Sequence, residues 1–305
     1  MNIIGRRKIW YAISLVLIVP GVVSMIMFRL QLGIDFKGGS VVTIQGKSDA
    51  SQIQADARSL GLKDVSIAST GSSQTAIRFR DEASGSKAEA DHQAFKAKLA
   101  SHGMTEVSFD TVGGSVSSDI TRNAILSILM ASLAIVLYIA YAFRNMPPPV
   151  SPWAFGVAAV MALLHDALFV LGIFSILGKV AGVEVDALFV TALLTIIGFS
   201  VHDTIVVFDR IRENLRRQRG TFEEIVNASI LETFARSLNT SITVLLTLLA
   251  LFLFGGASIK LFVLALLAGI ASGTYSSIFN ASPLLVTWHN HKIKQLQKQK
   301  TSTKN

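Results

Sequence analysis

Long apolar stretches with almost no charges recur along the chain. Six of them, 17–28 residues long, contain at most one acidic residue each and no Lys or Arg. A helix needs about 20 such residues to cross a bilayer. The predicted transmembrane helices cover residues 9–28, 124–143, 153–177, 187–208, 238–254 and 261–288. The pattern therefore predicts a polytopic α-helical membrane protein with six transmembrane helices.

Residues 29–122, between the first two predicted helices, follow a different pattern. Apolar positions predict strands at 40–45, 65–69, 75–80 and 106–112 and helices at 50–60 and 87–100. Residues 71–73, Gly-Ser-Ser, predict the turn of a hairpin. The order β-α-β-β-α-β predicts a small extracytoplasmic α+β domain of the ferredoxin-like type. We expect its two histidines, His92 and His102, to be solvated, and we find no catalytic constellation in it.

Two segments outside the spans also have a clear pattern. Residues 221–236 place apolar side chains on one helical face, which predicts an amphipathic cytoplasmic helix at the membrane surface, leading into the fifth span. Residues 289–305 form a basic cytoplasmic tail with five lysines. The predicted organisation is a cytoplasmic N-terminus with the first helix at 1–28, the domain at 29–122, five further helices at 123–288, and this tail.

The composition supports the membrane assignment. Of the 305 residues, 51% are apolar and only 16% are charged, and the mean hydropathy is +0.52. A soluble domain carries about 25% charged residues, so these values exclude a soluble enzyme. The chain has no cysteine, which excludes disulfides and thiolate metal sites. No zinc H-E-x-x-H motif occurs, and we expect neither enzyme activity nor a cofactor or metal.

The net charge of +8 is confined to one side of the membrane. With a cytoplasmic N-terminus, the cytoplasmic side holds 15 basic and five acidic residues, whereas the opposite side holds 13 of each. Lys and Arg near the ends of spans collect on the cytoplasmic side. We therefore expect both termini in the cytoplasm and residues 29–122 outside, and we expect no nucleic-acid partner.

Two acidic residues, Asp166 and Asp203, lie inside predicted spans. A charge at the bilayer centre costs about 2.5–3.5 kcal/mol on insertion scales, so such residues usually face the interior of a bundle and mark ion pathways. Asp166 is in the middle of the third span. Its neighbour His165 lies about 100° around the helix, so the two need not share a face. A role in holding helices together stays open for Asp166.

Asp203 lies on the fourth predicted helix beside a polar stripe. The stripe has spacings of four, three and four residues and consists of Thr191, Thr195, Gly198 and His202. Such a surface favours close helix packing or places protonatable groups, and both interpretations stay open. A basic run follows, and Arg236 then stands at the membrane boundary. We expect Arg236 either to extend to the lipid headgroups or to turn inward and pair with an Asp.

Two glycine motifs accompany the spans. Residues 33–39, GIDFKGG, follow the first span and predict a sharp exit turn, because glycine tolerates positive φ. Gly269 and Gly273 form a G-x-x-x-G motif in the last span, which predicts tight helix contact. We expect these glycines and the stripe on the fourth helix to face the helices of a partner.

These motifs resemble the SecD/SecF family of protein-translocation membrane proteins. Residues 33–39 match its G-x-D-F-x-G-G signature through Gly33, Asp35, Gly38 and Gly39. Residues 201–214, VHDTIVVFDRIREN, are similar to the fourth-helix signature of the SecF branch and include Asp209, Arg210, Arg212 and Glu213. His165-Asp166 and residues 112–116 and 253–256 also fit, so the resemblance covers essentially the whole chain. The chain departs from the family at Gly114, often proline there, and at His202, often asparagine.

The resemblance implies a subunit in the bacterial cytoplasmic membrane that is related to the resistance-nodulation-division exporters. Such proteins pair with SecD, associate with the SecYEG channel, and use the proton-motive force to assist the export of unfolded preproteins. The family motif implies that Asp203 and Arg236 take part in proton coupling, and His202 and Asp166 are further candidates. From the residues alone, three functions stay open: a proton-driven translocase subunit, a stand-alone proton-coupled small-molecule exporter, and a passive assembly scaffold.

Overall fold

The computed structural model describes residues 2–46, 49–70, 74–80, 86–147, 151–217 and 219–302. The chain divides into two compact units. The helical unit comprises residues 1–30, 127–180 and 188–305, and the small domain comprises residues 31–126 and 181–187.

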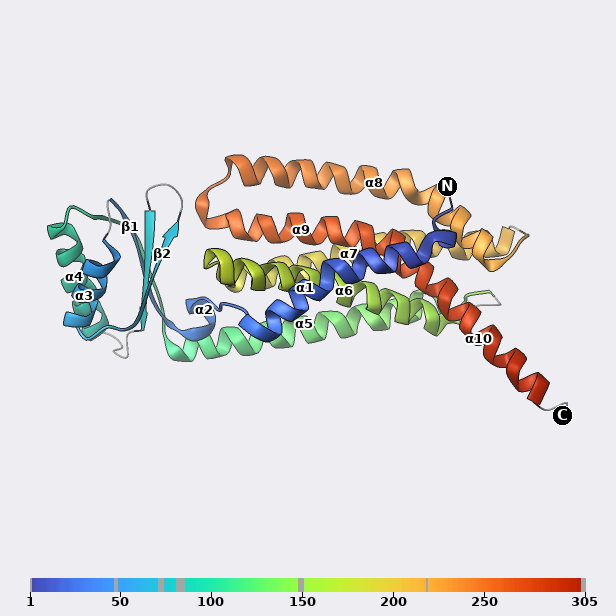
Figure 1. Cartoon of the computed structure of the whole chain (residues 1–305), viewed down its shortest axis with the longest axis horizontal. Coiled ribbons are helices and arrows are strands. Elements are labelled where there is room, and N and C mark those ends of the chain that lie inside the picture. Colours follow the sequence, from blue (N-terminus) through green and yellow to red (C-terminus); the bar gives the residue numbers. More distant parts are fainter. Residues whose placement is uncertain are drawn as a thin grey trace. The chain divides into compact units, whose positions relative to one another are not determined.

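Long helices form the helical unit (Figure 1). In chain order they are α1 (Arg7–Phe28), α5 (Gly114–Ala142, which begins in the small domain), α6 (Pro152–Ala181), α7 (Ala187–Arg217), α8 (Phe222–Phe254), α9 (Lys260–Ser276) and α10 (Ser282–Ser302). A π-helical turn, η3 (Ser277–Ala281), joins α9 to α10. Among the described residues, six helical segments are long and apolar enough to cross a membrane, as the pattern predicted.

Small residues bring several helices of the helical unit into close contact. The hydroxyl groups of Ser24 on α1 and Ser175 on α6 are 2.9 Å apart. Gly269 of α9 lies so close to Ile196 of α7 that an added Cβ would be 2.3 Å from its Cδ1. The G-x-x-x-G motif therefore makes the tight contact that was predicted, but with α7 of the same chain. The expectation that its glycines face a partner is wrong.

The amphipathic segment 221–236 leads directly into the fifth predicted span. Thr221 caps the start of α8 with a capping box to Glu224, and the helix then continues without a break to Phe254. Phe222, Val226 and Ile230 on its apolar face are buried in the core of the helical unit. These side chains pack against protein and not against lipid headgroups. Periodicity shows which face is apolar, but it does not show what covers that face.

The small domain is an antiparallel sheet with helices on one face (Figure 1). Its elements are α2 (Ile34–Lys37), β1 (Gly39–Gln45), α3 (Ala50–Ser59), β2 (Lys63–Thr70), β3 (Gln74–Arg80), α4 (Ser86–Ser101) and β4 (Thr105–Val112). The strand order is β2-β3-β1-β4, and all paired strands are antiparallel. Every strand and both larger helices were predicted within two residues of these bounds. The predicted turn at residues 71–73 lies outside the described residues.

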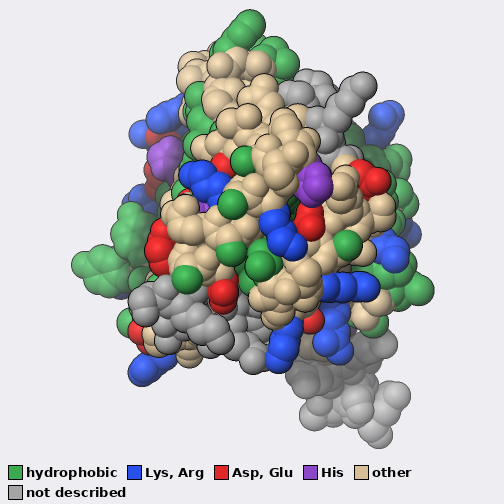
Figure 2. Space-filling view, turned by 90° about the vertical axis from the view of Figure 1, so that its left-hand side faces the viewer, with side chains coloured by type: hydrophobic (Ala, Val, Ile, Leu, Met, Phe, Trp, Pro, Cys, Tyr) green, Lys and Arg blue, Asp and Glu red, His purple; other side chains and the backbone are tan. Residues whose placement is uncertain are grey.

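The core of the small domain lies between the sheet and the helices α3 and α4. It is formed by Val42, Ile44, Ile53, Ala57, Leu62, Ile77, Phe79, Phe95, Leu99 and Met104. The outer face of these two helices is polar, with Lys and Arg interspersed among Asp and Glu (Figure 2). The domain therefore presents no single sign of charge on that face, as the even count of basic and acidic residues predicted.

The two histidines of the small domain are held by hydrogen bonds. His92 is buried, its ring stacks on Phe109 at 3.6 Å between ring centroids, and its Nε2 lies 2.8 Å from Glu106 Oε2. His102 is partly exposed, and its Nε2 lies 3.0 Å from Asp56 Oδ2. The expectation that both are solvated is therefore wrong for His92. The ring of Phe109, 17 residues downstream, and the carboxylate of Glu106, 14 residues downstream, replace water around it.

Candidate functional site

Asp166 lies at the centre of a buried polar cluster in the helical unit. It is only 1% exposed. Its Oδ1 accepts a hydrogen bond from Ser272 Oγ at 2.7 Å, and its Oδ2 accepts one from Ser200 Oγ at 2.5 Å and one from Ser276 Oγ at 2.6 Å. These serines belong to α7 and α9, so one carboxyl group connects three helices. Three hydroxyl donors suit an ionised carboxylate, which accepts hydrogen bonds and donates none.

His165 completes this cluster. Its Nδ1 lies 3.0 Å from Asp166 Oδ1, and the histidine is 8% exposed. Helical spacing suggested that the two side chains need not share a face, but they are in direct contact. Both residues are buried, and the imidazole and the carboxylate are each other's polar partners there. We call Asp166, His165, Ser200, Ser272 and Ser276 the Asp166 cluster.

Asp203 on α7 is also buried, at 2% exposure, but its surroundings differ. Within the described part of the chain its one side-chain hydrogen bond comes from Ser241 Oγ of α8, at 3.4 Å. Thr274 Oγ1 of α9 in turn lies 2.6 Å from Ser241 Oγ. Asp203 therefore has a single long hydrogen bond, whereas Asp166 has four short or ordinary ones. A buried carboxylate with so few donors is costly to keep ionised.

Helix α9 lies between the two acidic residues. Ser272 and Ser276 are four residues apart and face Asp166, whereas Thr274, between them in sequence, bonds toward Ser241 and Asp203. Ser277 adds a link to α7, because its Oγ lies 2.9 Å from Thr204 Oγ1. The hydroxyl residues at 272–277 thus supply polar partners on two sides of α9. Sequence reasoning missed this role, although the i, i+4 pair Ser272 and Ser276 was its visible signal.

His202 and Arg236 do not join either cluster. Both are exposed in the single chain, as are Thr191, Thr195 and Gly198 of the polar stripe. Within the described residues, Arg236 forms no ion pair, so the structure does not bring it together with Asp203. The reason lies in helical spacing, because Ser237 and Ser241 face the interior and Arg236 lies about 100° away from Ser237.

The charged residues that follow Asp203 form a network of ion pairs at the end of α7. Arg212 Nη2 lies 2.5 Å from Asp209 Oδ1, and Arg210 Nη1 lies 2.6 Å from Glu213 Oε2. Arg210 also pairs with Glu232 of α8. The buried Asn214 donates to Ser229 and Glu232 of α8, at 3.0 and 2.9 Å. Residues 209–214 therefore connect α7 to the first half of α8 and are more than an anchor at the membrane surface.

The glycine-rich motif after α1 makes close backbone contacts within the small domain. Gly33 N donates to Val185 O at 2.8 Å, and an added Cβ on Gly33 would lie 3.2 Å from that oxygen. Asp35 Oδ2 accepts a hydrogen bond from the backbone N of Ala187, the first residue of α7, at 2.8 Å. Gly38 and Gly39 have φ of 70° and 121°, values that favour glycine. The motif is the predicted exit turn, and it also holds the loop before α7.

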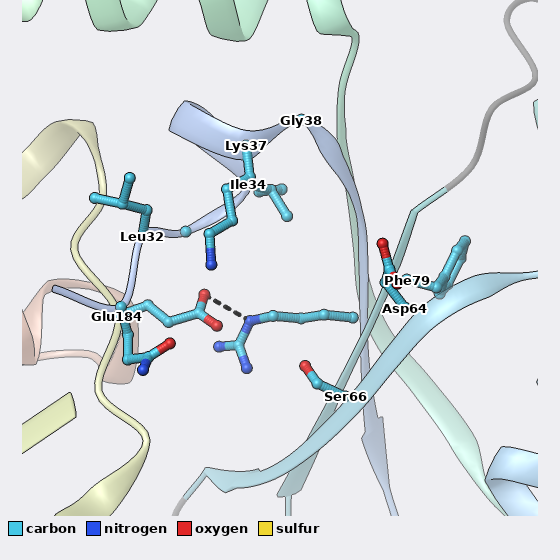
Figure 3. A pocket seen from close by; sticks show the side chains of 11 residues that line it. Leu32, Ile34, Lys37, Gly38, Asp64, Ser66, Phe79 and Glu184 are labelled. Atoms are coloured by element: carbon cyan, nitrogen blue, oxygen red, sulfur yellow. Dashed lines mark ion pairs between the residues drawn. The ribbon is translucent and has the colours of Figure 1, made fainter. Parts of the chain in front are cut away.

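A cavity of about 340 Å³ lies beside this turn in the small domain (Figure 3). Arg78 Nε and Glu184 Oε2 form an ion pair across it at 2.8 Å, with Lys37 pointing toward the same carboxylate (Figure 3). Burial raises the pKa of Glu184 despite the nearby charges of Arg78 and Lys37. The ion pair fastens the loop at Glu184 to strand β3.

Comparison with known proteins identifies the family. Residues 93–291 match the family described as "Protein export membrane protein SecD/SecF, C-terminal", and residues 23–50 match the "SecD/SecF GG Motif". The "Protein translocase subunit SecF" of Thermobaculum terrenum is 48% identical, over 95% of this chain and 94% of its own length. The chain belongs to the SecD/SecF protein-export family.

Longer members of the SecD/SecF family contain a segment that is similar to this chain. The "Protein translocase subunit SecDF" of Bacillus subtilis is 34% identical over 95% of this chain, but the match covers 38% of that protein. The crystal structure of SecDF from Thermus thermophilus, described as a translocon-associated membrane protein, is 32% identical with a TM-score of 0.83. The match covers 95% of this chain and 39% of the SecDF chain. The fold of this SecD/SecF-family chain is thus that of the matching part of SecDF.

Proposed function

We propose that this chain is a SecF-type subunit of the Sec protein-export machinery that works with a SecD-like subunit at the SecYEG channel. In this role it uses the proton-motive force to assist the export of unfolded preproteins. Its family and the relatives named as translocase subunits support the place in protein export. The SecDF relatives, in which a matching segment is joined to a longer chain, support the SecD-like partner.

The buried Asp203 carries the proposal of proton coupling. Moving one proton down a potential of about 100 mV releases about 2.3 kcal/mol, and its use requires a group that alternates between charged and neutral forms. Asp203 is buried and has one long hydrogen bond. These surroundings give the ionised form little support, so a positively charged neighbour would be needed to favour it. Asp166, with four partners, is less suited to that alternation.

Arg236 and the polar stripe support a second surface near Asp203. Arg236, His202 and Thr195 are exposed in the single chain, although lipid is a poor solvent for such groups. A SecD-like partner that covers this surface would give them polar neighbours. In this proposal Arg236 approaches Asp203 in one conformation of the complex and favours its ionised form there, because an opposite charge within about 4–6 Å favours ionisation.

The orientation and the type of the small domain complete the proposal. The excess of Lys and Arg on one side supports an orientation with both termini in the cytoplasm and the small domain outside the bacterial cytoplasmic membrane. The element order β1-α3-β2-β3-α4-β4 and the antiparallel strand order β2-β3-β1-β4 support a ferredoxin-like domain. A domain outside the membrane would stand where an exported chain emerges.

Replacement of Asp203 tests the coupling. Asp203→Asn keeps the shape and removes the charge change, so the complex should assemble normally while stimulation of export by the proton gradient is lost. Asp203→Glu should retain part of the stimulation. The measurement is the export rate of a reporter preprotein into inverted membrane vesicles, with and without a gradient. Asp119→Asn, an exposed acid on α5, is the control and should export at the rate of the unmodified chain.

Two other functions predict different results. A passive scaffold predicts that Asp203→Asn, present at normal levels, exports at the unmodified rate under a full gradient. A stand-alone small-molecule exporter predicts that the purified chain catalyses proton-coupled transport without a SecD-like subunit. Either result would contradict the proposal.

A further inference from the structure

The Asp166 cluster contains a buried nitrogen that the proposed function does not use. His165 Nδ1 faces Asp166, but His165 Nε2 is buried and has no hydrogen-bond partner among the described residues. Since Asp166 already accepts from three serines, its Oδ1 is best matched by an Nδ1 that carries hydrogen. Nε2 of the neutral ring is then a free acceptor with its lone pair inside the protein.

The charge of this pair depends on that nitrogen. With a neutral ring, Asp166 and His165 together carry one negative charge in a buried site. When Nε2 takes a proton, the imidazolium and the carboxylate form a neutral pair at 3.0 Å. An unpaired buried charge is costly, and a hydrogen-bonded pair of opposite charges relieves part of that cost. The cluster is therefore built to accept one proton, and the free nitrogen is where that proton has room.

We propose that Nε2 of His165 is a second proton-binding site of the helical unit, separate from Asp203. One proton from water adds to the Nε2 lone pair, and on release it returns to water. The Nδ1–H bond and the carboxylate of Asp166 stay as they are. Asp166 is then a positioning residue, because it selects the ring tautomer and balances the charge, as carboxylates do for histidines elsewhere.

The surroundings leave His165 as the basic group of this region. On α6 its titratable neighbour is Asp166, and on α9 it is Tyr275, whose ring centroid lies 6.2 Å away. Helices α7 and α1 contribute the hydroxyls of Ser200 and Ser14, and the next titratable group of α1, Tyr11, bonds to Thr287 instead. In the described part of the chain, no Lys or Arg pairs with Asp166.

Several polar groups lie around Tyr275, whose ring is next to that of His165. The hydroxyl of Tyr275 donates to Trp10 O at 2.8 Å and lies 3.4 Å from Ser14 Oγ. Ser14 Oγ donates to Asn280 Oδ1 at 2.9 Å, while Asn280 Nδ2 is a second buried atom without a partner among the described residues. Asn280 lies in the π-helical turn η3, a feature often found at functional sites. These groups form a hydrogen-bonded set beside the His165 ring, although none of them bonds to Nε2.

The site also has a direct connection to α7. Ser200 donates to Asp166 and lies three residues before Asp203 on the same helix. Protonation of Nε2 changes the net charge that Ser200 faces, and so changes how strongly α7 is held to α6. This link to Asp203 rests on the proposed function, whereas the proton site itself does not.

Nitrogen NMR of the purified chain in detergent tests the site without any export assay. The chain has six histidines, and His165→Gln identifies the ring signals of His165 by difference. We expect Nδ1 to stay protonated while Nε2 gains one proton as the pH is lowered through the range in which the chain stays folded. In Asp166→Asn we expect the Nδ1–H tautomer to lose its preference. His202→Gln, on an exposed histidine, should leave the signals of His165 unchanged.

The outcome separates this proposal from the one on Asp203. If the Nε2 signal keeps one protonation state across that range, the site does not exist, whatever Asp203 does. If Nε2 titrates, His165→Gln should shift the pH profile of gradient-stimulated export, whereas Asp203→Asn should abolish the stimulation at every pH. An unchanged pH profile in His165→Gln would overturn the link to transport. Full export by Asp203→Asn beside a titrating Nε2 would overturn the proposed function and leave the proton site standing.

Discussion

Gly21 of α1 and Gly172 of α6 meet backbone to backbone. A Cβ atom added to Gly21 would lie 2.6 Å from the Cα of Gly172. A Cβ atom added to Gly172 would lie at the same distance from the Cα of Gly21. Ser24 and Ser175 lie one turn further along the two helices and are joined by a hydrogen bond. In lipid, helices associate through such close backbone approach and polar contacts rather than through a hydrophobic driving force. This crossing therefore fastens α1 to the rest of the helical unit.

Substitution of Gly172 should separate α1 from α6. Gly172→Leu places a branched side chain where no Cβ fits, and overpacking of this kind costs about 1–3 kcal/mol. We expect a lower melting temperature of the purified chain in mild detergent and a lower level in membranes. Gly156→Leu on the same helix is the control, because an added Cβ there has no neighbour within 4 Å. Equal loss of stability in both variants would contradict the role of the crossing.

The sequence predicted the elements well and their partners poorly. Apolar runs predicted all six spans, and short-range periodicity predicted the four strands and two helices of the small domain, because both patterns are local. The prediction that Gly269 faces another subunit was wrong. A small residue indicates that a helix approaches closely, but it does not indicate which helix. The same limit explains residues 221–236, where the covering surface proved to be protein.

The acids of the candidate site were visible in the sequence, but the difference between them was not. Asp166 and Asp203 each stand alone in an apolar run. Their hydrogen-bond partners lie 34 to 110 residues away, at Ser200, Ser272 and Ser276 for Asp166 and at Ser241 for Asp203. Only the packing of α7, α8 and α9 shows that one carboxyl group is enclosed by donors and the other is not. The contact between His165 and Asp166 was not predicted, because the spacing of two residues on a helix does not give the directions of their side chains.

Asp35 should matter for the start of α7. Its carboxylate accepts from the N–H of Ala187, a group that no residue of the helix can satisfy. Asp35→Ala removes this acceptor and should cost about 0.5–2 kcal/mol, the usual range for a lost helix cap. We expect faster hydrogen exchange at residues 185–190, measured by mass spectrometry. Asp35→Asn, which keeps an oxygen acceptor, should have a smaller effect, and an unchanged exchange rate in Asp35→Ala would contradict the capping role.

The exposed stripe of α7 should lie against a partner. A photo-reactive amino acid at Thr195 should form a discrete adduct with a SecD-like chain in native membranes, since this polar surface is left open by the single chain. The same amino acid at Leu129, an exposed apolar position on α5, measures the background from lipid-facing sites. Mass spectrometry of the adduct identifies the second chain. Absence of any protein adduct at Thr195 would favour the stand-alone exporter.

The proposed orientation can be tested directly because the chain has no cysteine. Ser101→Cys in the small domain and Gln295→Cys in α10 are both exposed positions. The charge distribution predicts that a membrane-impermeant thiol reagent labels Ser101→Cys in intact spheroplasts and labels Gln295→Cys only after the membrane is opened. Labelling of both in intact spheroplasts would contradict the orientation.

Glu106 should make the small domain sensitive to acid. Burial alone would raise the pKa of Glu106, but hydrogen bonds from His92 and Lys96 and their charges outweigh it, so its pKa is lowered. Because the folded pKa lies below the unfolded value, the ionised Glu106 contributes its full stability above the ordinary range of about 4.3. In the unfolded chain the group takes up its proton first as the pH falls. The contribution is then lost as the pH falls further, through the folded pKa.

A fragment of residues 36–113 gives a direct measurement of this effect. We expect it to fold alone, because all residues of its core lie between 42 and 104. Urea unfolding should show that Glu106→Gln lowers the free energy of unfolding by about 1 kcal/mol near pH 7. The difference between the two fragments should become smaller at acidic pH, below the unfolded pKa of about 4.3, as the folded carboxylate takes up its proton. Glu89→Gln is the control. Glu89 is exposed and lies 4.0 Å from His92, and the fragment with this substitution should keep the acid dependence of the unmodified fragment. If Glu106→Gln lowers the free energy of unfolding by the same amount at neutral and at acidic pH, the acid dependence does not come from this carboxylate.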